Sequence, residues 1–429
     1  MLLIYTQKIT PRFTYAFKHI LFRILGIQVQ FTTVLEEFIA HNGPKLSYGK
    51  QPLGNELFVQ EHGLLGQQGI EDIPILVKMW DAVPAFFATS DRSAIPYDIF
   101  ASAFYLLSRY EEYLPHVKDH KGRFPASESM ANAHEFLELP VVDLWTYKFK
   151  DVLKRSFPEM DFPNQTPIVH TVLHVQQPFK YRQKGMFRSL LGYIDDLAKL
   201  KFTALLNRTQ VILRLRKDPY DTFNWVINVV KRSTTKMTAF FLLGENEYYK
   251  DSLNTHRNAF SQLVKFVGDY NEVGLLYSGS SLVKFEVLQS EIKRIEAITN
   301  RTLISGKQAN FFLNLPENYR NLIELEIAKD FTMAYYDTPG FRAGTCTPFL
   351  FYDLDYEIKT PLLIQPIAVT SDALRAFSPE IIEKKVNDLL EVTETVNGTF
   401  SMVFTNEDFS IEAQDVWKKL FSETLQNYE

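Results

Sequence analysis

The chain has 429 residues, of which 46% are hydrophobic, 14% aromatic and 23% charged. This composition excludes a disordered chain and predicts two or three folded domains, because a single core seldom grows beyond about 250–300 residues. The net charge of −5 offers no basic field for nucleic acid, and the single cysteine, Cys346, excludes a disulfide framework or a zinc site built from several thiolates.

The N-terminal segment predicts neither a secretion signal nor a membrane anchor. Its apolar run, residues 2–5, is short, and Lys8 and Arg12 place charges directly after it. No stretch of the sequence reaches the ~18 uncharged apolar residues of a membrane-spanning helix. We therefore expect a cytoplasmic chain without a transmembrane segment and without a nucleic-acid partner.

The first part of the chain predicts short strands and helices in alternation. Thr10 and Pro11 are typical of a helix start, as the cap and the first-turn residue, and Gly26 is typical of a helix end. The predicted elements are a strand over 2–5, a helix over 10–25, a strand over 27–31 and helices over 97–113 and 141–153. Residues 157–167 contain three prolines and predict a linker.

The second part predicts a regular alternation of strands and helices. The predicted strands are 168–175, 237–243, 272–276, 302–304, 332–335, 362–366 and 399–404. The predicted helices are 220–231, 252–269, 284–299, 319–329, 379–392 and 411–425. This order favours a parallel α/β sheet, open or closed into a barrel, whose functional groups would lie at the C-terminal ends of the strands.

Five stretches of the sequence, together with the predicted strand ends, carry a resemblance to a known family. The stretches are GFRAGTCTPFLFYDL (340–354), HNGPKLSYGKQPLGNE (41–56), YDIFASAFYLLSRYEEYLPHVKD (97–119), KDPYDTF (217–223) and LPENYRNL (315–322). They resemble a two-domain group of bacterial polysaccharide deacetylases of the carbohydrate esterase type, found in the Bacteroidetes. The resemblance implies an α/β fold: a mixed N-terminal α/β domain over 1–160, followed by a deacetylase-like distorted (β/α) barrel over 161–429.

The resemblance also implies what an active site of this family contains. One Asp and two His hold a divalent ion, usually zinc, while a second Asp serves as general base and a late His as general acid. A metal with an open position lowers the pKa of its bound water towards ~7 and polarises the acetyl carbonyl. The carboxylate then takes a proton and the imidazole returns one to the leaving amine.

The positions of this chain that match those roles carry other residues. The family patterns T-I-D-V-D, G-L-H-P-S, S-R-Q-H and H-N-E align with residues 172–176, 274–278, 306–309 and 405–407. The matching positions are His174 for the base, Gln176 for the metal Asp, Leu276 and Ala309 for the metal His residues and Thr405 for the acid. Gln carries no charge and Leu has no lone pair for a metal. We therefore expect no metal and no cofactor, although active relatives use zinc.

Several candidate residues leave two roles open. His174 acts either as a lone base or weak metal ligand, or as a structural residue at a strand end, which we favour. Arg342 either binds an anionic ligand or pairs with a structural acid such as Asp353. Cys346 is expected to be a buried, inert thiol. The other ligand-binding candidates are Gln176 and Gln177, which either hydrogen-bond a sugar or only solvate a strand end, and Lys307 and Asn406.

Two further segments carry charge next to apolar residues. Residues 109–113, RYEEY, indicate either an interface between the two domains, which we favour slightly, or a solvated helix end. Residues 182–217 hold nine cations and two acids, with leucines between them; the cations are Arg182, Lys184, Arg188, Lys199, Lys201, Arg208, Arg214, Arg216 and Lys217. This segment lies on an anionic membrane surface, covers the barrel as a lid, or is a solvated pair of helices packed on the core; the last is the default.

Taken together, the resemblance and the replaced residues favour a pseudo-enzyme. We expect a catalytically inactive polysaccharide deacetylase homologue that binds glycan or supports an active enzyme partner in cell-surface polysaccharide metabolism. Two alternatives stay open: an active hydrolase that removes N-acetyl groups from a sugar polymer, and a structural subunit that uses the surface of 182–217.

Overall fold

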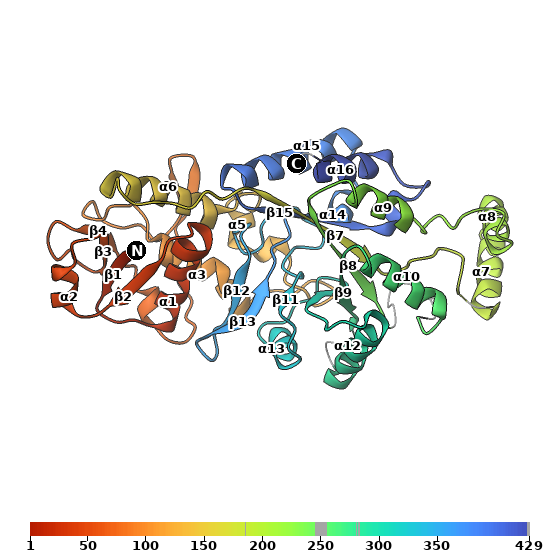
Figure 1. Cartoon of the computed structure of the whole chain (residues 1–429), viewed down its shortest axis with the longest axis horizontal. Helices are drawn as coiled ribbons and strands as arrows, with labels where there is room; N and C mark the ends of the chain where they lie inside the picture. Colours follow the sequence, from red (N-terminus) through yellow and green to blue (C-terminus); the bar gives the residue numbers. More distant parts are fainter. Residues whose placement is uncertain (185, 245–254, 280, 282–283, 427–429) are drawn as a thin grey trace.

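The computed structural model describes residues 1–184, 186–244, 255–279, 281 and 284–426. The first three residues of the helix predicted over 252–269 lie outside this range. The molecule is elongated (Figure 1): the N-terminal part, a second α/β part and a helical hairpin follow one another along its long axis. Within the described residues, no helix combines the length and the apolar character needed to cross a bilayer.

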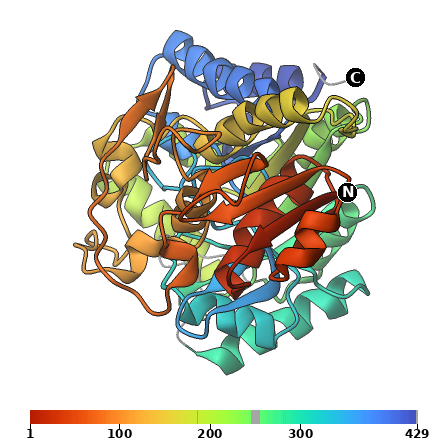
Figure 2. The same ribbon diagram turned by 90° about the vertical axis from the view of Figure 1, so that its left-hand side faces the viewer.

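The first part is built on a four-stranded parallel sheet with the order β2-β1-β3-β4 (Figure 2). Its strands are β1 (Leu2–Thr6), β2 (Val29–Thr32), β3 (Lys45–Gly49) and β4 (Leu57–Gln60), and β5 (Lys78–Trp80) and β6 (Val83–Ala85) form a separate hairpin. Its helices are α1 (Pro11–Phe17), the π-helix η1 (Lys18–Ile24), α2 (Leu35–Ala40), η2 (Leu64–Gly66), α3 (Ile99–Leu107), α4 (Tyr110–Tyr113), η3 (Ala126–Glu128), α5 (Met130–Ala133) and α6 (Val141–Ser156).

The predicted elements of this part are confirmed with two changes. Thr10 caps α1, since its hydroxyl accepts a hydrogen bond from the Phe13 amide at 3.0 Å. The helix then widens into the π-helix η1 before it ends at Gly26, which has a φ of 69°. The helix predicted over 97–113 is interrupted at Arg109, whose left-handed backbone (φ 54°) separates α3 from α4.

The second part is built on a nine-stranded sheet with the order β12-β13-β11-β10-β9-β8-β7-β15-β14, in which only the β12–β13 pair is antiparallel. Its strands are β7 (Ile168–Val175), β8 (Lys236–Leu242), β9 (Glu272–Tyr277), β10 (Ser305–Gln308), β11 (Lys329–Asp330), β12 (Phe349–Asp353), β13 (Ile358–Ile364), β14 (Val369–Thr370) and β15 (Thr399–Thr405). Its helices are α7 (Met186–Ala198), α8 (Phe202–Ile212), α9 (Phe223–Val230), α10 (Asn258–Gly268), α12 (Phe285–Thr299), α13 (Glu317–Glu324), α14 (Ser371–Leu374), α15 (Pro379–Thr395), η4 (Asn406–Phe409) and α16 (Asp415–Gln426).

The strand predictions are confirmed for the strands that are mostly apolar. They are wrong for the strands that are mostly polar. β7, β8, β9 and β15 lie where the sequence predicts them. The strands predicted over 302–304 and 332–335 are displaced, because the real strands β10 and β11 read SGKQ and KD and carry no apolar signal. The edge strand β12 is absent from the prediction.

The nine strands form an open sheet, and one chain segment contacts strands near both of its edges. The amides of Gln365 and Ile367 donate to the carbonyls of Asp330 and Met333, beside β11, at 2.9 and 3.1 Å. The amide of Ala368 donates to the Ser401 carbonyl in β15 at 2.9 Å. Residues 365–368 therefore run from β11 to β15, and the described strands do not close a hydrogen-bonded barrel. The fold is mixed α/β with a largely parallel sheet.

Two apolar clusters hold the structure together. The larger one contains side chains of both parts, including Tyr15, whose hydroxyl donates to the Leu350 carbonyl at 2.7 Å. The smaller one lies on one face of the nine-stranded sheet and consists of Val172, Phe240, Leu242, Leu276, Ala309, Phe311, Phe331, Ala334, Ile367 and Val403. The larger cluster is continuous across residue 160, and the division of the chain into 1–160 and 161–429 stays a prediction.

Candidate functional site

Strand register brings the candidate positions to one end of the nine-stranded sheet. Thr405 at the end of β15 pairs with His174 in β7, and Leu276 in β9 pairs with Lys307 in β10. The side-chain amide of Gln176 donates to the carbonyl of Ala309 at 3.0 Å. The residues that align with metal ligands and proton-transfer groups are therefore neighbours in space, as expected for C-terminal strand ends.

His174 is held as a neutral imidazole. It is only 6% exposed, and its Nδ1 atom has no hydrogen-bond partner among the described residues. Burial, together with the positive charge of Lys307, keeps the pKa of His174 well below its ordinary value. A neutral imidazole can ligate a metal, so the character of this site depends on what surrounds it.

Lys307 is a fully buried amine in the same site. Its Nζ lies 3.2 Å from the Gln308 carbonyl and 3.4 Å from the centre of the Phe311 ring. Burial lowers the pKa of Lys307 to about 7, against the opposing influence of the carboxylates of Asp330 and Asp372. In the family pattern S-R-Q-H this position is Arg. This chain has a cation at the same position, but its residues 174 and 176 are His and Gln, where the pattern expects acids.

Apolar side chains fill the rest of the site. Leu276 is fully buried and Ala309 nearly so, and both belong to the smaller apolar cluster with Phe240 and Leu242. In the part of the chain that the structure describes, no three His, Cys, Asp or Glu side chains are grouped so that they could hold a metal ion.

Thr405 and Asn406 serve local structure. Thr405 forms a capping box with Asp408: its hydroxyl accepts from the Asp408 amide at 3.3 Å, while the Asp408 carboxylate accepts from the Thr405 amide at 2.7 Å. The Asn406 side chain donates to the carbonyls of Gln177 and Tyr220 at 3.1 and 3.0 Å. Lys307, Gln177 and Asn406 are all buried, so they do not reach a ligand at the surface of this structure.

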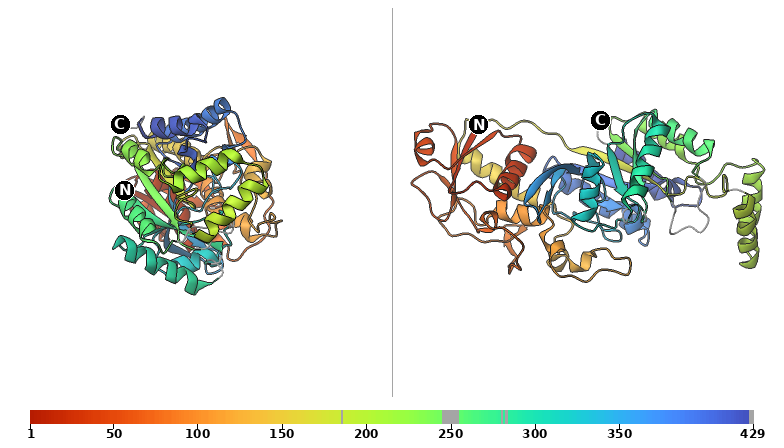
Figure 3. Two further views of the ribbon diagram at one scale, coloured as in Figure 1. Left: turned by 90° about the vertical axis from the view of Figure 1, so that its right-hand side faces the viewer. Right: turned by 90° about the horizontal axis from the view of Figure 1, so that it is seen from below.

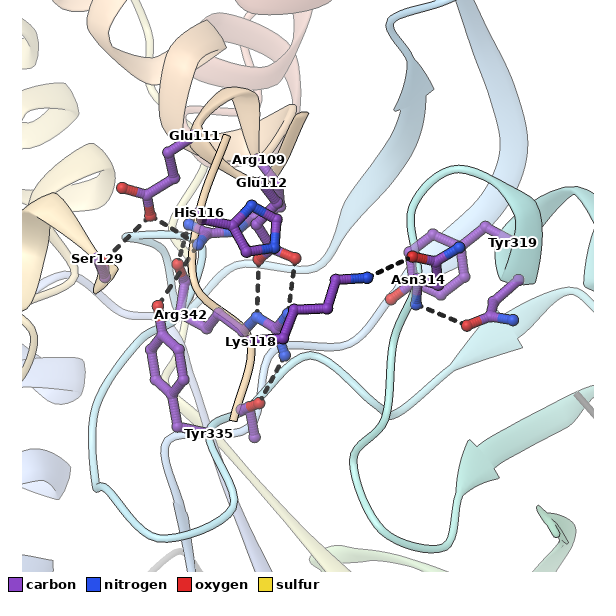
Figure 4. A network of polar contacts seen from close by, with 12 residues as sticks. Arg109, Glu111, Glu112, His116, Lys118, Ser129, Asn314, Tyr319, Tyr335 and Arg342 are labelled. Atoms are coloured by element: carbon purple, nitrogen blue, oxygen red, sulfur yellow. Dashed lines mark hydrogen bonds and ion pairs between the residues drawn. The ribbon is translucent and has the colours of Figure 1, made fainter. Parts of the chain in front are cut away.

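Arg342 lies in a buried network between the two parts (Figure 4). Its guanidinium donates to both carboxylate oxygens of Glu112, at 2.9 and 2.7 Å, and to the Ala334 carbonyl at 3.0 Å. Arg109 donates to the same carboxylate at 2.7 Å and to the Arg342 carbonyl. The interface expected for residues 109–113 is therefore present, and Arg342 is directed at protein groups.

The predicted partner of Arg342 is corrected by this network. Asp353 is paired with Arg320, at 2.6 and 2.8 Å, and not with Arg342. The acid that Arg342 meets, Glu112, lies 230 residues away in sequence. Local sequence carries no signal for such a pairing.

Cys346 is buried beside another internal acid. Its amide donates to the Asp143 carboxylate at 3.1 Å, and burial followed by the charge of Asp143 raises the pKa of the thiol well above its ordinary value. A thiol that resists ionisation is a poor nucleophile, which agrees with the expected inert role. The neighbouring Gly340 has a φ of 134°, and a Cβ there would lie 2.6 Å from the Leu137 carbonyl, so the tight backbone path requires glycine.

A cavity of about 810 Å³ lies beyond β7 in the chain, between the segment 181–184 and the pair of helices α7 and α8. Its lining includes two aromatic rings, Tyr181 and Tyr193, and the side chains of Arg182, Arg214 and Arg257. Sequence reasoning missed this cavity because it is formed by loop residues and by α7, whose contacts depend on the fold.

Comparisons with known proteins add little about function. Residues 2–158 match a family of unknown function, DUF7033. No curated protein matches the sequence. Among solved structures, a protein from Mycobacterium smegmatis assigned as a polysaccharide deacetylase is 12% identical, with a TM-score of 0.38, over 61% of this chain and 85% of that one.

Two other structures are similar at the same low level. The wild-type CE4 family pseudoenzyme from Bacillus anthracis is 10% identical, with a TM-score of 0.31, over 60% of this chain and 61% of that one. The 4-alpha-glucanotransferase from Thermococcus litoralis is 11% identical, with a TM-score of 0.35, over 60% of this chain and 36% of that one. Similarity this low assigns neither a site nor a reaction to this chain.

Proposed function

We propose that the chain is a catalytically inactive homologue of the metal-dependent polysaccharide deacetylases, which binds glycan or supports an active enzyme partner. One observation carries the proposal: the five positions that align with the metal ligands and proton-transfer groups lie together at one end of the sheet, and none keeps the family residue. Two of them, Leu276 and Ala309, pack into an apolar cluster. Hydrolysis through a metal-bound water requires ligands that these side chains do not offer.

The state of Lys307 supports the same proposal. A buried cation next to carboxylates and a metal would belong to an electrostatically balanced site. Here His174 is neutral and the pKa of Lys307 falls to about 7, because burial is not offset by the remaining acids. Such a site does not have the charge pattern that an active member of the family would need.

The glycan-binding part of the proposal concerns the cavity beyond β7 more than the strand ends. Four of the five ligand-binding candidates, Arg342, Gln177, Lys307 and Asn406, have buried side chains. The cavity combines the partly exposed ring of Tyr193 with guanidinium donors, and pockets that bind small molecules join apolar walls to a few polar groups in this way.

Zinc binding tests the proposal. After incubation with zinc and dialysis, we expect the wild-type protein to retain no stoichiometric zinc in elemental analysis. We expect the triple variant Gln176→Asp, Leu276→His, Ala309→His to retain about one zinc per chain, because three ligands are then close together at the strand ends.

The variant Gln176→Asp alone is the matched control and should retain none, since one carboxylate does not make a site. Stoichiometric zinc in the wild-type protein that is lost in His174→Ala would contradict the proposal and favour the active hydrolase.

A further inference from the structure

A second pocket, far from the strand ends, lies where the first part meets the hairpin of β12 and β13. It has a volume of about 370 Å³ and is lined by nine residues. Four of them come from the π-helix η1: Lys18, His19, Phe22 and Arg23. π-Helical turns are rare and occur frequently at functional sites.

The charge of this pocket is entirely positive. Lys18 and Arg23 face it from η1 and Lys359 faces it from β13, and none of the nine lining residues is acidic. Within the described part of the chain, these three cations form no ion pair. An uncompensated cluster of cations around a concave surface attracts an anion.

His19 adds a buried polar group without a partner. It is 2% exposed, and neither ring nitrogen forms a hydrogen bond within the described residues. Burial, and then the charge of Arg23, lowers the pKa of His19 to about 3, so the ring is neutral and offers one donor and one acceptor. Leaving such groups unpaired destabilises the folded chain, and a bound polar ligand would remove this cost.

We propose that this pocket binds a small phosphorylated molecule. A phosphate dianion matches the three cations better than a single carboxylate does, and Arg23 is the residue type suited to phosphate oxygens. The volume is at the lower end of the range of about 300–1,000 Å³ for small-ligand pockets, so it holds more than the phosphate itself. Phe22, Val29 and Leu350 provide an apolar wall for the remainder of the ligand.

Calorimetric titration with glucose 6-phosphate, inorganic phosphate and glucose, at constant ionic strength, tests this site. We expect saturable binding of both phosphate compounds and none of glucose. The double variant Arg23→Gln, Lys359→Gln should weaken binding at least tenfold, and Lys384→Gln, an exposed cation on α15, should not change it.

Two results would overturn the phosphate site: no saturable heat with either phosphate compound, or an unchanged affinity in the folded double variant. Equal binding of glucose would equally overturn it. Zinc plays no part in this experiment, so its outcome is independent of the pseudo-enzyme proposal.

A different observation concerns the hairpin of α7 and α8, which stands apart from the body of the molecule on two connecting segments (Figures 1 and 3). Both segments meet at Asp218. Its carboxylate accepts hydrogen bonds from the amides of Lys180, Tyr181 and Arg182 at 2.8, 2.9 and 2.9 Å. The default expectation for the segment 182–217 is therefore wrong: it neither packs on the core nor covers the smaller apolar cluster.

The contact between α7 and α8 is made in part by polar groups. The Tyr193 and Thr209 hydroxyls are 2.9 Å apart, and the Arg208 guanidinium donates to the Asp196 carboxylate at 2.9 Å. Asp196 and Arg208 are both less than 10% exposed. In a helix pair surrounded by water, such groups normally face outward.

The outer surface of the hairpin is apolar instead. Leu190, Ile194 and Leu197 follow one another at helical spacing on α7 and are all more than half exposed. Among the described side chains of this segment, the exposed large apolar ones are Leu190, Leu191, Ile194, Leu197, Leu200, Phe202, Leu206, Ile212, Leu213 and Leu215. An apolar surface of this extent marks an interaction site.

The charged residues around this apolar surface indicate the kind of partner that it fits. Exposed cations surround the apolar residues at Lys199, Lys201, Arg214, Arg216 and Lys217. The only exposed acid described on the two helices and their junction is Asp195, which is paired with Lys199 at 2.8 Å. The side chain of Arg188 lies outside the described residues. We infer that the hairpin lies on an anionic lipid surface, with its leucines in the headgroup region and its cations at the phosphates.

Co-sedimentation with vesicles tests this surface. We expect the protein to bind phosphatidylglycerol–phosphatidylcholine vesicles, to bind pure phosphatidylcholine at least tenfold more weakly, and to lose affinity as salt rises. The variant Leu191→Gln, Ile194→Gln, Leu197→Gln should lose binding, whereas the control Leu53→Gln, Leu76→Gln, Val117→Gln, which alters exposed apolar residues elsewhere, should keep it.

Failure to bind anionic vesicles would overturn the lipid surface. A concentration-dependent dimer that the hairpin variant abolishes, without vesicle binding, would do the same and would place a second copy of the chain on the hairpin.

Discussion

We expect the substitution Glu112→Gln to lower the free energy of unfolding by about 3–5 kcal/mol, the range for breaking a buried ion pair by removing one partner. The carboxylate of Glu112 accepts three hydrogen bonds from Arg109 and Arg342, at 2.7 to 2.9 Å, and the side chains of all three residues are buried. The neutral amide keeps the shape of the side chain and leaves two guanidinium groups with Glu111 as the remaining acid. Urea denaturation at pH 7 measures the loss.

The same substitution has a defined pH dependence. Burial alone would raise the pKa of Glu112, but Arg342 and then Arg109 outweigh it and lower the value from 4.5 to about 2. A carboxylate with a depressed pKa stabilises the folded state above its ordinary pKa, and this contribution is lost as the pH falls towards the folded value. The difference in the free energy of unfolding between the wild-type protein and the variant should therefore become smaller as the pH falls from about 5 towards 3.

An exposed ion pair provides the control. Lys419 and Glu383 are 2.9 Å apart on the surface of α15 and α16. Because solvent screens such a pair, Glu383→Gln should lower the free energy of unfolding far less than Glu112→Gln does. An equal loss in the free energy of unfolding in the two variants would show that the buried network contributes no more to stability than a surface ion pair does.

The second large effect is a gain in stability. We expect Lys307→Met to raise the melting temperature by a few degrees at pH 6, because Asp330 and Asp372 compensate the buried charge only in part and an apolar side chain of similar length removes its desolvation cost. The pKa of Lys307 is lowered from 10.5 to about 7. Between these values the unfolded state holds the proton more tightly, so the stability of the wild-type protein rises with pH across this window.

The gain in melting temperature of the variant over the wild-type protein should therefore be largest at and below pH 7 and decrease towards pH 10. Differential scanning calorimetry at pH 6, 7.5 and 9 measures this trend, with Lys384→Met as the exposed control that should show none of it. A variant that is less stable at every pH would mean that the contacts of Lys307 with Phe311 and Gln308 outweigh the cost of burial.

The sequence predicts the elements whose apolar residues follow a clear period and misses those held in place by their neighbours. β7 and β8 consist mostly of apolar residues and are predicted nearly to the residue. β10 reads SGKQ and is a strand because β9 and β11 pair with it on both sides. A single sequence does not contain that information.

The candidate site divides in the same way. The resemblance predicts which positions lie at the strand ends, and the pairing of Thr405 with His174 agrees with it. The burial of Lys307 is not predictable, because lysine is almost always exposed and its environment here is made by Phe311, Asp330 and His174. The partner of Arg342 is not predictable either, because a pairing between residues far apart in sequence depends on how the two parts pack.

The carboxylate of Asp218 has a consequence for how this protein can change over time. Asp218 lies where the chain returns from the hairpin, and it accepts hydrogen bonds from three amides at the point where the chain enters the hairpin. Insertions and deletions between these two points alter neither the register of β7 nor the start of α9. Residues 183–217 can therefore change in length without a change in the sheets, so this segment can vary while the rest of the fold is kept.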